Sequence, residues 1–198
     1  NADLLIGTAK KIDELSKAIY IQSKSFDKIE ELAKNKIDML ASIPAILPVS
    51  LKNKSTHQVT SSFGYRMHPI YKTPKFHAGM DFMGTVGTPI YATGNGVVIE
   101  SKFDKGYGRH VVIDHGFSYK TLYAHMDKIL AKKGQKIKRG DVIGYLGNTG
   151  LSTGPHLHYE VRKNNKPIDP INFYFNDLTP DEFELLVETA NNTGQSMD

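Results

Sequence analysis

The first 43 residues carry the pattern that most constrains the fold, because they contain no proline and only one glycine. Their apolar residues recur three and four positions apart, close to the a and d positions of a heptad repeat, and Gln22 interrupts the seam at one d position. The residues of the seam are Leu5, Ile12, Leu15, Ile19, Phe26, Ile29 and Ala33. Lys and Glu dominate the positions between them. The pattern predicts one long amphipathic helix of roughly 60 Å, at 1.5 Å per residue.

A helix of this length needs a partner for its apolar stripe. The partner could be a second copy of the chain, a helix upstream of Asn1, or the remainder of the chain. We interpret residues 1–43 as a helical, coiled-coil-like stalk, and leave open whether it self-associates or binds a partner helix. A helix lying on a membrane surface is the lesser alternative, because its polar face mixes acids and bases.

A change of pattern follows the predicted helix. Pro44 and Pro48 forbid its continuation and favour an extended linker, which we place at residues 44–57. Beyond it glycine becomes frequent, and short β-rich runs alternate with turns without helices between them. This spacing predicts a mainly β fold, with a small antiparallel β-sheet domain over residues 58–178.

The C-terminal segment, residues 179–198, returns to helical signals. Thr179 is suited to the N-cap, Pro180 to the first helical position, and Glu182 to the reciprocal bond of a capping box. We expect a short helix from about residue 180 to 190, followed by a frayed tail.

Composition excludes several kinds of function. The formal net charge is +4 and the isoelectric point is near 9.0, but the lysines are scattered and no basic stripe is interleaved with aromatic residues, so no nucleic-acid partner is expected. The absence of cysteine removes thiolate zinc sites, disulfides and a cysteine nucleophile together. No run of about 18 apolar residues is present that could span a membrane.

The stretch "HAGMD" places His77 and Asp81 four residues apart, where they share a face on a helix or on a strand. Nearby glycines argue against a helix. An imidazole with a carboxylate is a suitable donor set for Zn²⁺, although the pair alone is a weak signal.

The stretch "TGPHLHYEV" adds two histidines, His156 and His158, on one face of a predicted strand, which is typical of metal or catalytic sites. His125 ends another strand-like run, "TLYAHM". Taken together, two His and one Asp with an open fourth position match a catalytic zinc site, and two further histidines could transfer protons. Of the four remaining histidines, His57, His110 and His115 are interpreted as structural.

Four segments carry a family resemblance: "SSFGYRMHPIYKTPKFHAGMDF", "GVVIESKFDKGYGRHVVIDHGFSYKTLYAHM", "GQKIKRGDVIGYLGNTG" and "STGPHLHYEV". Over about residues 58–175 the chain resembles the lysostaphin-like (LytM-type) zinc endopeptidases. That family has a small antiparallel β-sheet domain whose groove holds one zinc ion. Its members cleave peptide bonds in the stem or cross-link peptides of bacterial peptidoglycan, which is therefore the substrate that the resemblance implies.

The resemblance also implies a role for each of five residues. His77 and Asp81, which match H-x₃-D, would be two ligands of one zinc ion per chain, and His158, the second His of H-x-H, the third. His125 and His156 would be the catalytic histidines, and which of them is the general base stays open. The expected groove residues are Arg66, His68, Tyr71 and Asn148.

These roles lead to an expected activity and location. We expect a zinc metalloendopeptidase that hydrolyses peptidoglycan peptides during cell-wall remodelling. The alternative is a catalytically silent or latent wall-binding or scaffolding regulator of other murein hydrolases, and the presence of all five key residues weighs against it. The substrate lies outside the cytoplasmic membrane, so we expect an exported, periplasmic or cell-envelope protein, with a membrane anchor upstream of Asn1.

Overall fold

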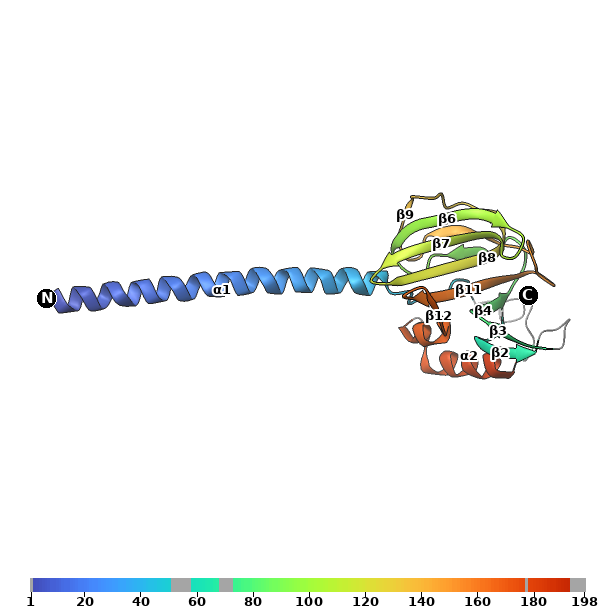
Figure 1. Cartoon of the computed structure of the whole chain (residues 1–198). Coiled ribbons are helices and arrows are strands. Elements are labelled where there is room, and N and C mark those ends of the chain that lie inside the picture. The colour runs from blue at the N-terminus through green and yellow to red at the C-terminus, as the bar shows by residue number, and fades with distance from the viewer. Residues whose placement is uncertain (1, 51–57, 68–72, 177, 193–198) are drawn as a thin grey trace. The chain divides into compact units, whose positions relative to one another are not determined.

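The computed structural model describes residues 2–50, 58–67, 73–176 and 178–192, and the chain divides after Leu40 into two compact units. The N-terminal unit is helix α1 (Ala2–Ser42), drawn in blue in Figure 1, which confirms the predicted long helix. No side chain of α1 is buried, so its apolar seam is open to solvent. Whether this seam pairs with another helix stays a prediction.

The second unit is built on antiparallel strands. They are β1 (Gln58–Ser61), β2 (Gly64–Met67), β3 (Pro74–His77), β4 (Met80–Met83), β5 (Pro89–Tyr91), β6 (Gly96–Asp104), β7 (Gly108–Gly116), β8 (Tyr119–Ile129), β9 (Lys136–Ile137), β10 (Val142–Leu146), β11 (His156–Lys163) and β12 (Lys166–Ile168). A 3₁₀ helix, η1 (Pro170–Asn176), and helix α2 (Pro180–Asn192) follow them. The predicted fold class, mainly β with a helix at each end, is confirmed.

Over the described residues the main sheet has ten strands, and its longest path runs in the order β1-β4-β11-β8-β7-β6-β9. Strands β10 and β5 pair with each other beside β8, and β12 pairs with β11. The hairpin β2–β3 forms a separate two-stranded sheet. In Figure 1 the long strands β11, β8, β7 and β6 run side by side. This order places β4, β11 and β8 next to one another, and four of the five candidate site residues lie on these strands, the fifth being at the end of β3.

Buried tyrosines connect the central strands below the site. Tyr123 on β8 and Tyr159 on β11 are fully buried. Their hydroxyl groups lie 3.0 Å and 2.9 Å from the hydroxyl of Thr93, so both are satisfied inside the core. Such a satisfied polar network fixes neighbouring strands relative to one another.

The segment predicted as a linker, residues 44–57, is part of the packed body over its described length. Leu47 and Val49 belong to the hydrophobic core. The guanidinium of Arg139 donates hydrogen bonds to backbone carbonyls just before this segment. Residues 51–57 lie outside the described part of the chain.

The N-terminus of α2 has the predicted capping box. The backbone N–H of Thr179 donates to a carboxylate oxygen of Glu182 at 3.0 Å, and the N–H of Glu182 donates to the Thr179 hydroxyl at 3.3 Å. Each residue thereby satisfies a backbone donor of the other at the start of the helix.

Candidate active site

Three side chains from β3, β4 and β11 converge at one point. His77 ends β3 and Asp81 lies on β4, after a tight connection that contains Gly79. A Cβ on Gly79 would lie 2.3 Å from the carbonyl oxygen of Tyr159, so only glycine allows the connection to pass this close to β11. On β11, His158 is paired directly with Asp81 in the strand register.

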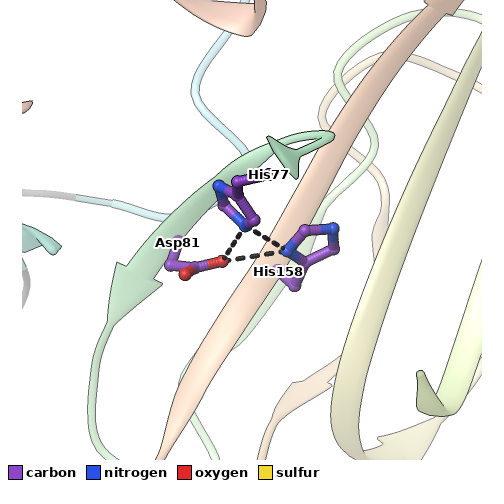
Figure 2. A group of neighbouring side chains, drawn as sticks. All are labelled: His77, Asp81 and His158. Carbon is purple, nitrogen blue, oxygen red and sulfur yellow. Dashed lines mark hydrogen bonds and ion pairs between the residues drawn. The ribbon is translucent and has the colours of Figure 1, made fainter. Parts of the chain in front are cut away.

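The three converging atoms form a nearly equilateral triangle, shown in Figure 2. Nε2 of His77 lies 3.0 Å from Oδ1 of Asp81, and Nδ1 of His158 lies 2.9 Å from both. All three side chains are buried. We refer to these three residues as the metal triad.

Hydrogen bonds outside the triangle fix which ring nitrogen faces into it. Nδ1 of His77 lies 3.0 Å from the Ser62 carbonyl and donates to it, and Nε2 of His158 donates to Oε1 of Glu160 at 3.2 Å. Neutral rings held in this way turn lone pairs toward each other and toward the Asp81 carboxylate. Three acceptors so close repel one another unless a cation lies among them. Two imidazole nitrogens and one carboxylate oxygen fit Zn²⁺.

Charge in the site is set by two buried carboxylates. Burial alone would raise the pKa of Asp81, but its contact with His158 and the positive charge of Arg66 hold that pKa below its usual value. Burial would also raise the pKa of Glu160, but its bonds to His158 and Arg162 lower it to about 2. Both carboxylates are therefore ionised at neutral pH: Asp81 as a candidate ligand, and Glu160 as the acceptor that orients His158.

Two further histidines lie beside the metal triad, and we refer to His125 and His156 as the histidine pair. Their ring centroids are 4.6 Å apart, and His125 is 6.0 Å from the ring of His158. Nδ1 of His125 donates to the Thr149 carbonyl at 2.8 Å, and Nδ1 of His156 to the Gly154 carbonyl at 2.9 Å. Each Nε2 then carries a lone pair that can accept a proton. In His156 this atom is buried and has no hydrogen-bond partner among the described residues.

The backbone is unusual at His125. Its φ of 59° lies in the left-handed region, which a residue with a side chain adopts at a cost in conformational free energy. The pairing of β7 with β8 shifts register here, where β8 contains one residue more than β7. Bulges of this kind re-aim a side chain beside a functional site. The bulge explains how a histidine near the end of a long strand points toward the triad.

An open cavity lies over the site. Its lining includes His77, His125 and His158, together with Arg66, Lys75 and Tyr107. A substrate in this cavity would therefore contact two triad residues and one member of the histidine pair directly.

The predicted groove residues fall into three groups. Arg66 lies in the cavity lining. Asn148 is exposed and is absent from that lining among the described residues, although its neighbour Thr149 supports His125. His68 and Tyr71 lie outside the described part of the chain.

The histidines interpreted as structural lie away from the described cavity lining or outside the described residues. His110 and His115 are buried, and Nδ1 of each bonds to a backbone carbonyl, of Gly108 and Asn95 respectively. His57 lies outside the described part of the chain.

The sequence analysis did not predict that Glu160 accepts a hydrogen bond from His158. Glu160 is fully buried; its Oε1 accepts a hydrogen bond from the Tyr107 hydroxyl at 2.8 Å, and its Oε2 accepts one from Nε of Arg162 at 2.7 Å. The signal was available, because alternation along a strand puts His156, His158 and Glu160 on one face. An acid on that face next to a metal-type histidine predicts a bond to the outer ring nitrogen.

Comparisons with known proteins identify a family and several relatives of this chain. The family model described as "Peptidase family M23" matches residues 75–170, which include the metal triad and the histidine pair. The chain is 47% identical over 116 residues to a protein of Vibrio cholerae named peptidoglycan DD-endopeptidase ShyA, over 58% of this chain and 27% of that protein. The curated relatives that it matches first are thus much longer, and the aligned part spans about a quarter of them.

Two solved structures are similar in fold and in sequence. A zinc-containing peptidase from Vibrio cholerae is 46% identical, with a TM-score of 0.57, over 62% of this chain and 37% of that one. The catalytic domain of the prophage-encoded M23 protein EnpA from Enterococcus faecalis is 38% identical, with a TM-score of 0.52, over 58% of this chain and 88% of that one.

Proposed function

The chain belongs to peptidase family M23, and from this premise we propose that it is a zinc-dependent endopeptidase that hydrolyses peptide bonds in the stem or cross-link peptides of peptidoglycan. The observation that carries the proposal is the convergence of the metal triad beside the histidine pair under one cavity. The names of the relatives, which include peptidoglycan DD-endopeptidases, support the choice of substrate.

The metal triad would hold one Zn²⁺ through Nε2 of His77, Oδ1 of Asp81 and Nδ1 of His158. When bound, the ion polarises a carbonyl group and lowers the pKa of a coordinated water toward about 7. The protein contributes the shape of the site. Glu160 and the Ser62 carbonyl keep both imidazoles in the tautomer that binds metal.

The histidine pair supplies proton transfer. Each ring holds its Nδ1 proton against a backbone carbonyl, so Nε2 is the atom that exchanges protons at the reaction centre. One member accepts the proton of the attacking nucleophile, and the pair returns a proton to the leaving amine. As a ring becomes protonated it turns into a donor on both nitrogens, and can then stabilise negative charge on the carbonyl oxygen under attack.

The proposed substrate also suggests where in the cell the protein acts. Because peptidoglycan lies outside the cytoplasmic membrane, we propose that the protein is exported and faces the wall. Among the described residues, no helix combines the length and the apolar character needed to cross a bilayer. The expression of an epitope-tagged full-length gene product followed by envelope fractionation tests the location.

Digestion of purified cross-linked peptidoglycan tests the activity. The zinc-loaded protein should release muropeptide monomers, release should stop when a chelator removes the metal, and it should resume when Zn²⁺ is restored. The alternative function, a silent or latent regulator, predicts no cleavage under any of these conditions. Because a regulator would still bind the wall, a pull-down with insoluble peptidoglycan run in parallel separates the alternative from an inactive preparation.

A further inference from the structure

The hairpin β2–β3 places two cations directly opposite each other at the edge of the site. Arg66 on β2 is paired with Lys75 on β3, and Lys75 lies two residues before His77 on the same strand. Opposed residues on paired strands share a face, and so do residues two apart on one strand. Arg66, Lys75 and His77 therefore point to one side of the hairpin, and all three line the cavity.

A pair of like charges in this arrangement is unfavourable for folding, because like charges directly opposite on a sheet repel. Lys75 is exposed and forms no ion pair with any described residue. Arg66 is half-buried, lines the same cavity and donates from Nη1 to the Ser61 hydroxyl. Positions that cost stability in this way are common where a ligand supplies the compensating charge.

The two carboxylates of the site already contact other side chains, so neither is available to neutralise Lys75. Asp81 faces the other two members of the metal triad. Glu160 is held by His158, Tyr107 and Arg162. A divalent cation in the triad would add further positive charge. The cavity wall made by the hairpin is therefore suited to an anionic group on the substrate.

We propose that Arg66 and Lys75 form a subsite for a substrate carboxylate that lies next to the scissile amide nitrogen. The inference rests on the proposed function and specifies its substrate. A link from D-alanine to diaminopimelate has a free carboxylate on the carbon bonded to that nitrogen. A glycine bridge has none within its interior, and a lysine side-chain amine has none beside its nitrogen. A charge-paired carboxylate thus selects bonds between two D-centres over glycine or lysine cross-links.

The test uses two substrates that differ in one group. One is a purified muropeptide dimer linked from D-alanine to diaminopimelate, and the other is the same dimer with the carboxylate beside the scissile nitrogen converted to a carboxamide. The full chain loaded with zinc should have a kcat/KM about tenfold or more higher for the carboxylate form, as expected for hydrogen bonds to charged groups.

Substitutions of Arg66 and Lys75 test whether these two side chains cause the preference for the carboxylate dimer. Arg66→Gln and Lys75→Gln should each lower the ratio of kcat/KM for the carboxylate dimer to kcat/KM for the carboxamide dimer, and Arg66→Lys should restore part of that ratio. Lys166→Gln, which removes an exposed lysine on β12, is the matched control. Zinc content and melting temperature, measured on every variant, separate loss of the subsite from loss of metal or fold.

The possible outcomes distinguish failure of the carboxylate subsite from failure of the proposed endopeptidase activity. Equal cleavage of both dimers by the unaltered protein, or variants that slow both dimers equally, would overturn the carboxylate subsite and leave the endopeptidase intact. Cleavage of neither dimer would contradict the proposed function instead. In that case the binding of each dimer to the zinc-loaded protein is measured by calorimetry. Tighter binding of the carboxylate dimer that is lost in Lys75→Gln supports the subsite, and equal affinities for the two dimers refute it.

Discussion

The metal triad and the histidine pair use the same side chain for different purposes, and strand β11 contributes to both. His158 has its Nε2 tied to Glu160 and presents Nδ1 to the triad, whereas His156 has its Nδ1 tied to the Gly154 carbonyl and leaves Nε2 available. The two residues share one face of one strand, two positions apart. The partner of the outer nitrogen therefore decides which of them can bind metal and which can exchange a proton.

The largest effect should come from breaking the triad itself. Asp81→Ala removes the one anionic donor and leaves two buried imidazoles that cannot hold zinc alone. We expect loss of bound zinc and of all cleavage of peptidoglycan, measured by atomic emission and by chromatography of released muropeptides. Asp38→Ala, on exposed α1, is the control and should change neither. Full zinc occupancy in Asp81→Ala would exclude this residue as a ligand.

Removal of a member of the pair should separate chemistry from metal binding. We expect His156→Gln to lower kcat by about 10² to 10⁴, the usual contribution of general acid–base catalysis, and to keep one zinc per chain. His110→Gln is matched to it, because His110 is also buried and its Nδ1 also bonds to a carbonyl, but it does not line the described cavity. If His156→Gln lost zinc in parallel with activity, the distinction between triad and pair would fail.

Local sequence signals were sufficient for much of the molecule. The heptad pattern predicted helix α1, which is observed over Ala2–Ser42, and the capping signals at Thr179 predicted the start of α2. Motif spacing predicted that His77 and Asp81 share a face of one element; they lie instead on two strands, β3 and β4, joined by a tight connection, and their side chains still meet at 3.0 Å. These features depend on residues close in the chain, so periodicity and capping chemistry describe them well.

Features that depend on contacts between distant segments were not predictable in the same way. The direction in which the His125 side chain points depends on a bulge between β7 and β8. No sequence pattern in either strand predicts this bulge. Lys75 joins the cavity only because β3 pairs with β2 opposite Arg66. The burial of Leu47, in a segment with two prolines, depends on a core assembled from the whole body.

The support behind the triad can be weakened without removing a ligand. Glu160→Gln keeps the size of the side chain but replaces the carboxylate that accepts from His158, Tyr107 and Arg162. We expect zinc affinity to fall by about 10- to 100-fold, as for other partners of metal-binding histidines, which is less than for loss of a ligand. Competition with a fluorescent chelator measures it. Unchanged affinity would mean that Glu160 serves packing alone, and Glu100→Gln, beside His110, controls for the loss of a carboxylate.

The smallest effect concerns a histidine that resembles the pair but lies outside the site. Nδ1 of His115 also bonds to a carbonyl, that of Asn95, but its Nε2 lies 2.8 Å from the Thr121 hydroxyl and is thereby occupied. If the contact of Nε2 distinguishes a catalytic histidine from a structural one, His115→Gln should keep both zinc and activity.

The same variant should change the pH dependence of stability. Burial lowers the pKa of His115, so below pH 6.5 the unfolded chain binds a proton that the folded protein does not, and stability falls as the pH falls. Loss of this histidine should flatten the decline between pH 7 and 5, by at most about 1.4 kcal/mol per pH unit, in urea unfolding of the full chain. An unaltered slope would show that the pKa of His115 is the same in the folded and unfolded states. A loss of cleavage would show that occupation of Nε2 is not what separates the two kinds of histidine.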